Sequence, residues 1–197
     1  MSSETAFNDI YREYHHKILR YISILANNEE AEDITQDVFE KVNRGLAGFK
    51  GKSQVSTWIY RIATNAALDR MRSPSFKSTR EELKEASEDR NVWTSQRRTP
   101  VDQQLIRKEM SECVKEHIDK LSSEYKTVIL LSEQEGLSNQ EIADVLQISL
   151  ENVKIRLHRA RASLKKILDE ACEFYHNEQN ILACDRKSSI IKFKKSD

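Results

Sequence analysis

Basic side chains gather in one short stretch near the C-terminal end of the sequence. Six lysine and arginine residues and one histidine lie between Asn152 and Lys166, with no acidic residue among them: Lys154, Arg156, His158, Arg159, Arg161, Lys165 and Lys166. The whole chain has 32 Lys plus Arg and 32 Asp plus Glu, so attraction to nucleic acid must come from local clustering. Lysine and arginine neutralise phosphates, and arginine forms paired hydrogen bonds with guanine edges. The chemistry predicted for this stretch is DNA binding.

Two helices separated by a short turn would present this basic stretch. Ser138 and Glu141 have the spacing of a capping box, which predicts that a helix starts there, and Ser149 can cap a second helix. The expected apolar stripes are Ile142, Ala143 and Leu146 on the first helix, and Val153, Leu157, Ala160, Leu164, Ile167 and Leu168 on the second. A short helix, a tight turn and a longer basic helix form the helix-turn-helix pattern, whose second helix enters the major groove. A solvated basic face on an ordinary bundle helix is the alternative, but charge, turn, cap and stripe coincide and favour DNA binding.

The composition of the 197-residue chain indicates an all-α protein. It has four glycines and two prolines, and its hydrophobic positions follow helical periods nearly everywhere. No apolar run approaches the ~20 residues of a membrane span, and the N-terminus lacks signal-peptide character. The three cysteines are widely spaced, which fits a reducing cytosol. We therefore expect a cytoplasmic protein without membrane insertion. No phosphate loop, catalytic triad or metal-hydrolase motif is visible, so we expect no enzyme and no cofactor.

The N-terminal part is predicted to contain three helices, at 5–26, 29–47 and 55–71, with a loop at 48–54. The second helix has an acidic and polar face made of Glu32, Asp33, Gln36, Asp37 and Glu40. Such a face alone is usually only solvated. Ser56 or Thr57 is expected to cap the third helix. Trp58 on that helix, beside the basic loop, could stack on unpaired bases, although taken alone it is more often a core residue.

The predicted organisation is two small helical domains, 1–73 and 101–171, joined by a polar flexible linker at 74–100 and followed by a C-terminal extension at 172–197. The second domain should begin with a helix at 101–121. Ser122 or Ser123 is expected to cap the next helix, which ends at Gly136. The helix-turn-helix follows.

Three motifs, in this order, resemble bacterial RNA polymerase sigma factors of the small two-domain extracytoplasmic-function (ECF) group. AEDITQDVFEKV (31–42) is similar to the region-two helix that docks on the polymerase clamp. FKGKSQVSTWIYRIATNAALDRMR (49–72) is similar to the promoter-melting segment, and GLSNQEIADVLQISLENVKIRLHRARASL (136–164) to the region-four helix-turn-helix. The resemblance covers roughly residues 5 to 170.

The resemblance implies a promoter-specificity subunit, acting with the clamp and flap of RNA polymerase core and with promoter DNA, and in some members held by an anti-sigma factor. By this resemblance the acidic face of the second helix would bind the polymerase. The residues implied for a flipped base of the minus-ten element are Phe49, Lys52, Ser53, Arg61 and Asn65. Those implied for the duplex minus-thirty-five element are Asn152, Lys154, Ile155, Arg156, His158 and Arg159, of which Lys154, Arg156 and Arg159 suit phosphates or guanines best.

The sequence departs from the family pattern at three places. An aromatic residue is typical where Gln54 and Val55 stand, an acid is frequent at the position of Lys52, and a small polar residue is frequent at the position of Ile155. The base preferences of relatives therefore do not transfer to this chain. Neither the target promoters nor the inducing signal can be read from the sequence.

The C-terminal extension admits several interpretations. Cys172, His176 and Cys184 are candidate ligands for a metal or redox-sensing site, with Cys113 as a conceivable fourth residue. The simpler expectation is a short helical extension or turn that packs Phe174, Tyr175, Ile181 and Leu182 on the second domain. Contact with DNA, polymerase or a regulator is a third. For the whole chain, the rival to a sigma factor is a stand-alone helix-turn-helix regulator, although its sensor domain would need neither the 31–42 nor the 49–72 motif.

Overall fold

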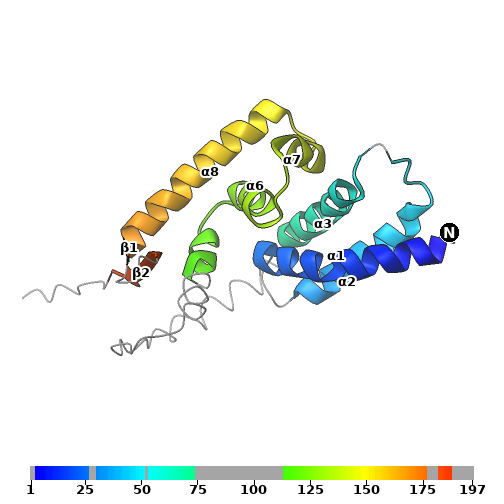
Figure 1. Cartoon of the computed structure of the whole chain (residues 1–197), viewed down its shortest axis with the longest axis horizontal. Helices are drawn as coiled ribbons and strands as arrows, with labels where there is room; N and C mark the ends of the chain where they lie inside the picture. The colour runs from blue at the N-terminus through cyan, green and yellow to red at the C-terminus, as the bar shows by residue number, and fades with distance from the viewer. Residues whose placement is uncertain (1–2, 27–29, 52, 74–112, 177–181, 188–197) are drawn as a thin grey trace, which may run out of the picture.

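The computed structural model describes residues 3–26, 30–51, 53–73, 113–176 and 182–187 (Figure 1). The described helices are α1 (Ser3–Ala26), α2 (Ala31–Leu46), α3 (Val55–Arg72), α6 (Ser123–Ile129), the π-helical segment η2 (Leu130–Gln134), α7 (Asn139–Leu146) and α8 (Leu150–Ala171). Residues 113–118 are also helical. A short hairpin of β1 (Cys172–His176) and β2 (Leu182–Arg186) follows α8. The prediction of an essentially helical fold is confirmed.

Helices α1, α2 and α3 pack together as one bundle, called here the N-terminal bundle. Its helices lie where the sequence predicted them, at 5–26, 29–47 and 55–71, with ends that differ by at most two residues. Each helix buries one apolar stripe, and the fully buried side chains include Ile18, Tyr21, Ile22, Val38, Val42 and Ile59. Inside the bundle the Tyr21 hydroxyl and Thr64 Oγ1 are 2.9 Å apart in a buried hydrogen bond, so the buried phenol has a partner.

The start of α3 differs from the prediction. Neither Ser56 nor Thr57 caps the helix, because α3 begins at Val55 and its N-cap is Gln54, which has the extended backbone of a cap residue. The Ser56 hydroxyl instead donates to the Gln54 side chain at 3.5 Å. Thr57 turns inward and is buried. The buried face of α3 includes Ile59, Tyr60, Ala63 and Ala67, whereas Trp58, Ile62 and Ala66 are half-buried.

Residues 113–176 and 182–187 form the C-terminal unit, in which the predicted caps are present. Ser122 caps α6. Ser138 and Glu141 form both hydrogen bonds of the capping box at the start of α7, and the Ser149 side chain accepts from the backbone N–H of Asn152 at the start of α8. The chain turns between α7 and α8 through Gln147, whose φ of 55° is left-handed. These local contacts fix the helix-turn-helix.

The N-terminal bundle and the C-terminal unit contact each other chiefly through α3 and α7, and their buried apolar side chains form one continuous cluster. A polar contact closes this interface: the Tyr60 hydroxyl on α3 donates to the Glu135 carboxylate, and Arg20 on α1 lies 3.6 Å from the same carboxylate. The Glu135 side chain is only 3% exposed. Burial, together with the neighbouring Glu135, raises the pKa of Tyr60, so its hydroxyl keeps the proton that it donates.

The extension after α8 is a β-hairpin, so the expected helix or turn is wrong. β1 and β2 pair antiparallel, with Phe174 opposite Cys184. The backbone N–H of Lys187 donates to the carbonyl of Ala171 at 2.9 Å, which returns the end of the hairpin to the end of α8. Phe174 and Tyr175 are about two-fifths exposed, so they do not pack inward as expected. The reason is the pairing itself, because the backbone N–H and C=O groups of each strand form hydrogen bonds with those of the other strand.

Several predictions concern residues outside the described ranges. They are the linker at 74–100, the part of the 101–121 helix before residue 113, the side chains of Ile181 and Leu182, and the last ten residues. Within the described residues, no helix has the length and hydropathy needed to cross a membrane.

Candidate nucleic-acid interface

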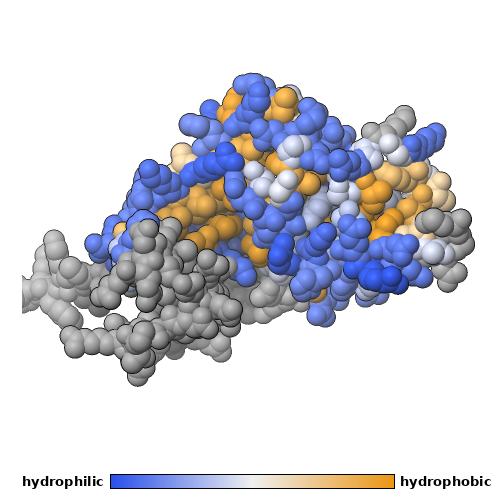
Figure 2. Space-filling model, viewed as in Figure 1, coloured by the Kyte–Doolittle hydropathy of each residue, from blue (hydrophilic) through white to orange (hydrophobic). Residues whose placement is uncertain are grey.

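Helix α8 presents a basic surface because its apolar stripe faces the other way. Val153, Leu157 and Ala160 are buried against the rest of the C-terminal unit. The opposite face is exposed and contains Lys154, Ile155, His158, Arg159, Arg161, Lys165 and Lys166. On the face shown in Figure 2, hydrophilic residues cover the outer edge of α8 over most of its length. Four of the six residues predicted to read duplex DNA, Lys154, Ile155, His158 and Arg159, are therefore exposed on this helix.

Arg156 differs from its neighbours because other side chains hold it. Its Nε donates to the side-chain oxygen of Asn152 at 3.2 Å, and a terminal nitrogen lies 3.7 Å from a carboxylate oxygen of Glu124 on α6. Both Asn152 and Arg156 are half-buried. Lys154 and Arg159 instead extend from the exposed face. Arg156 is thus oriented before any ligand arrives, whereas the other cations can adjust to phosphates.

The loop before α3 and the exposed side of α3 form a second candidate surface. The ring centroids of Phe49 and Trp58 are 4.9 Å apart, with an angle of 31° between the ring planes. The indole also lies over α2 so closely that a Cβ at Gly45 would come within 2.9 Å of it. Both aromatic side chains are half-buried, so their remaining surface is accessible. At this end of the bundle, where α1 begins, hydrophobic residues reach the surface (Figure 2).

Arg61 and Asn65 follow Trp58 at helical spacing and lie on the same side of α3. Asn65 is exposed. Arg61 is half-buried, and within the described residues its Nε is a buried nitrogen without a hydrogen-bond partner. Asn65 lies about 10 Å further along the helix axis than Trp58, two turns beyond the aromatic pair. Ser53 is half-buried, and Lys52 is outside the described residues.

The acidic face of α2 is fully presented to solvent. Glu32, Asp33, Gln36, Asp37 and Glu40 are all exposed, while the apolar stripe of α2 faces α1 and α3. Glu40 pairs with Arg44 one turn later at 2.8 Å. At the beginning of the helix, Glu30 accepts two hydrogen bonds from Arg70 of α3, at 2.5 and 2.7 Å. This pairing with Glu30 raises the pKa of Arg70. Most of the acidic surface therefore remains available to a basic partner.

The candidate metal ligands of the tail are placed differently from the prediction. Cys172 is buried, but His176 is exposed and neither it nor Cys184 lies in a common ligand cluster with Cys172. Cys172 instead approaches Cys113 and His117, and His117 was not predicted from the sequence. The available signal was the four-residue spacing of Cys113 and His117, which places both on one face of a helix.

Comparison with known proteins identifies the family of the chain. The Sigma-70 region 2 model matches residues 10–76, and the Sigma-70, region 4 model matches residues 111–164. The RNA polymerase sigma factor YlaC of Bacillus subtilis is 33% identical over 174 residues, which cover 88% of this chain and 98% of that protein. The ECF RNA polymerase sigma factor SigW, also of Bacillus subtilis, is 33% identical, over 84% of this chain and 90% of that protein. The chain belongs to the ECF sigma factors.

Solved structures agree with this sigma factor in fold. One is CnrH in complex with the cytosolic domain of CnrY, with a TM-score of 0.59 and 24% identity, covering 84% of this chain and 89% of that chain. Another is RpoE in complex with the anti-sigma factor NepR from Bartonella quintana, with a TM-score of 0.57 and 19% identity, covering 83% and 97%. The sigma factor is accordingly a promoter-recognition subunit of RNA polymerase and has no enzymatic activity of its own.

Proposed function

We propose that this sigma factor binds RNA polymerase core, recognises the minus-thirty-five and minus-ten elements of its promoters and promotes DNA melting between them, as a cytoplasmic protein. In this assignment residues 1–73 and 101–171 act as separate recognition domains, joined by 74–100. The observation that carries the proposal is the exposed basic face of α8, in a helix-turn-helix whose caps and turn are all formed.

The face of α8 has the chemistry that duplex DNA requires. Lys154, His158 and Arg159 are exposed on its first three turns, where a recognition helix contacts bases and phosphates. Arg156 is held by Asn152 and Glu124, which lowers the entropy lost when its guanidinium meets a guanine edge. Ile155 is 42% exposed and offers apolar contact, for example to a thymine methyl group. We assign these residues, with Asn152, to the minus-thirty-five element.

The second surface suits an unpaired strand. Taking a base out of the stack costs a few kcal/mol, which a pocket must return through stacking and edge hydrogen bonds. Phe49 with Trp58 offers ring surface for stacking, and Arg61 and Asn65 offer hydrogen-bond donors on the same side of α3. We assign these residues, with Lys52 and Ser53, to the minus-ten element and to melting.

We assign binding of polymerase core to the acidic face of α2, where a carboxylate cluster complements a basic surface of the largest subunit. An anti-sigma factor is a further proposed partner, since the solved relatives CnrH and RpoE were captured with CnrY and NepR. Such a protein would control when the DNA-reading surfaces become accessible. The C-terminal extension would be regulatory.

The test is retention on sigma-free core polymerase followed by transcription of a genomic library. We expect the full chain to be retained and to produce discrete start sites that share two spaced sequence elements. Asp37→Lys, on the acidic face of α2, should weaken retention. Asp9→Lys makes the same charge change at an exposed position of α1 and is the matched control. A chain that shifts duplex DNA alone but does not bind core would instead be a stand-alone regulator, and the proposal would be wrong.

A further inference from the structure

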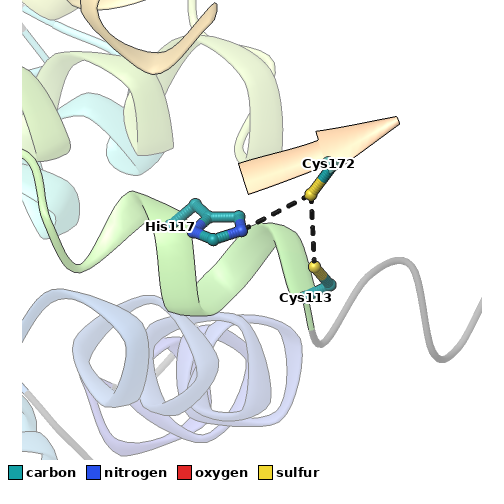
Figure 3. A group of neighbouring side chains, drawn as sticks. All are labelled: Cys113, His117 and Cys172. Carbon is teal, nitrogen blue, oxygen red and sulfur yellow. Dashed lines mark hydrogen bonds between the residues drawn. The ribbon is translucent and has the colours of Figure 1, made fainter. Parts of the chain in front are cut away.

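Three buried side chains from distant parts of the sequence converge beside the end of α8. Cys113 and His117 lie on the helical segment 113–118, and Cys172 lies where α8 ends and β1 begins (Figure 3). The Cys172 sulfur is 3.9 Å from that of Cys113 and 3.6 Å from Nε2 of His117. All three ligand atoms lie within 4.8 Å of one another. None of the three side chains is more than 7% exposed.

Two of these separations match those of ligands around one tetrahedral metal ion. With metal–sulfur bonds of about 2.3 Å and metal–nitrogen bonds of about 2.05 Å, neighbouring ligands of tetrahedral zinc lie about 3.75 Å apart for two sulfurs and about 3.55 Å for sulfur and nitrogen. The observed 3.9 and 3.6 Å agree with both edges to within a few tenths of an ångström. The third pair, the Cys113 sulfur and the His117 ring nitrogen, lies within 4.8 Å, and a bound metal would bring these two atoms closer together.

A redox pair of cysteines explains the arrangement less well. A disulfide requires the two sulfurs at about 2.05 Å, so the Cys113 and Cys172 sulfurs at 3.9 Å are separate thiols. A disulfide also gives no role to His117, whose Nε2 points at the Cys172 sulfur (Figure 3). Two thiolates and one imidazole are together the donor set of soft metal ions, zinc and copper(I) above all.

We propose that Cys113, His117 and Cys172 bind one thiophilic metal ion, Zn²⁺ or Cu⁺. Binding replaces the two thiol protons with bonds to the metal and releases those protons to solvent. Three protein ligands leave the fourth position of a zinc tetrahedron for an external ligand. Cu⁺ is favoured instead by the soft thiolate ligands of the site.

The metal would connect two ends of the C-terminal unit. Cys113 and His117 lie at the start of its described part, and Cys172 ends the DNA-reading helix and begins the hairpin. Because a ligand that binds only the folded chain stabilises it, occupancy of the site would raise the melting temperature of the protein. Metal availability could then set how firmly α8 is anchored. The site thus gives the proposed regulatory extension a chemical basis without depending on promoter recognition.

The first experiment is spectroscopic titration of the full-length reduced protein with Co²⁺, which substitutes for zinc and shows its ligands. We expect one equivalent to give a thiolate-to-cobalt charge-transfer band and tetrahedral ligand-field bands, and Zn²⁺ to abolish both by displacement. A parallel titration with Cu⁺ against a colorimetric chelator distinguishes the two metals by relative affinity. Melting temperatures with and without the preferred metal complete the measurement.

Matched variants separate this cluster from the other candidate ligands. Cys113→Ser and Cys172→Ser should lose the charge-transfer band and the metal-dependent rise in melting temperature, while Cys184→Ser and His176→Ala should keep both. His117→Gln retains both thiolates and should keep a charge-transfer band with altered ligand-field bands, which covers the case in which a cysteine variant does not fold.

Three results would overturn the proposal. They are the absence of Co²⁺, Zn²⁺ and Cu⁺ binding by the reduced wild-type chain, loss of binding in Cys184→Ser equal to that in Cys172→Ser, and a Cys113–Cys172 disulfide in a protein that binds no metal when reduced. None of these results bears on core binding or promoter recognition, so the function proposed above would stand.

Discussion

Arg156 has a fixed direction because Asn152 and Glu124 hold its guanidinium at the base of the exposed face of α8. A held arginine suits paired hydrogen bonds to one base, whereas an extended lysine suits a diffuse contact with phosphate. The same distinction separates Arg156 from Lys154, which is exposed two residues earlier. At the scale of single residues, the structure therefore separates one held arginine from the exposed cations around it.

Replacement of Arg156 tests this division. Arg156→Ala should weaken binding to the upstream element by about 1–3 kcal/mol and relax base preference at one position. Arg156→Lys should restore the charge but not the preference. Footprinting of the polymerase complex over variant upstream elements measures both effects. Arg12→Ala, which removes the same charge from an exposed position of α1, is the control. An unchanged footprint in Arg156→Ala would contradict the proposed contact.

Asn65 is exposed on α3 and has a different predicted effect. Asn65→Ala should reduce promoter opening, because a hydrogen-bond partner for an unpaired base is lost, while retention on core polymerase stays unchanged. Permanganate reactivity of unpaired thymines measures opening. Asn8→Ala removes an amide that is also exposed, on α1, and should open promoters normally. Loss of core binding in Asn65→Ala would show that its role is misassigned.

At the scale of elements, the helix-turn-helix depends on its caps. Ser138 and Glu141 exchange hydrogen bonds at the start of α7, and loss of an N-cap side chain costs about 1 kcal/mol. Ser138→Ala should therefore lower the melting temperature by about 2–4 °C for a chain of this size. Ser123→Ala is the control, because Ser122 and not Ser123 caps α6. Equal melting temperatures for the two variants would contradict the assigned cap.

The elements that could be predicted from the sequence are those specified by local signals. Ser138 and Glu141 are three residues apart, so their hydrogen bonds are readable in the sequence, and α7 and α8 begin where predicted. The hairpin could not be read in this way, because Cys172 to His176 become a strand only by pairing with residues 182–186.

The candidate site divides in the same manner. The accessible faces of α2 and α8 follow from helical periodicity, so Asp37 and Lys154 are exposed as the pattern indicates. The cluster of Cys113, His117 and Cys172 joins residues 55 and 59 positions apart. No periodicity links such residues, because their proximity results from the packing of the whole C-terminal unit.

At the scale of the whole molecule, the interface between α3 and α7 places the N-terminal bundle and the C-terminal unit against each other. Its polar contact centres on Glu135, whose buried carboxylate meets Tyr60 of the other unit and lies near Arg20. Removal of one partner from a buried hydrogen bond costs about 1–3 kcal/mol. The carboxylate thus contributes to holding the two units together.

Glu135→Ala should loosen this interface. We expect a larger radius of gyration in small-angle scattering and faster amide exchange in α3 and α7, because Tyr60 loses its buried acceptor. Glu133→Ala is the matched control, since Glu133 is exposed and pairs with Arg161 within the C-terminal unit. If Glu135→Ala leaves both scattering and exchange as in the parent chain, the carboxylate does not hold the units together.

The length of α8 keeps its two ends far apart. Its 22 residues form a rod of about 33 Å, with the DNA-reading side chains on the first turns and Cys172 directly after the last. Val153, Leu157 and Ala160 bury the first turns of this rod in the C-terminal unit, so the rod is held at the end that carries the basic side chains. A ligand bound at Cys172 would therefore lie about 33 Å from those first turns, too far to touch DNA bound there.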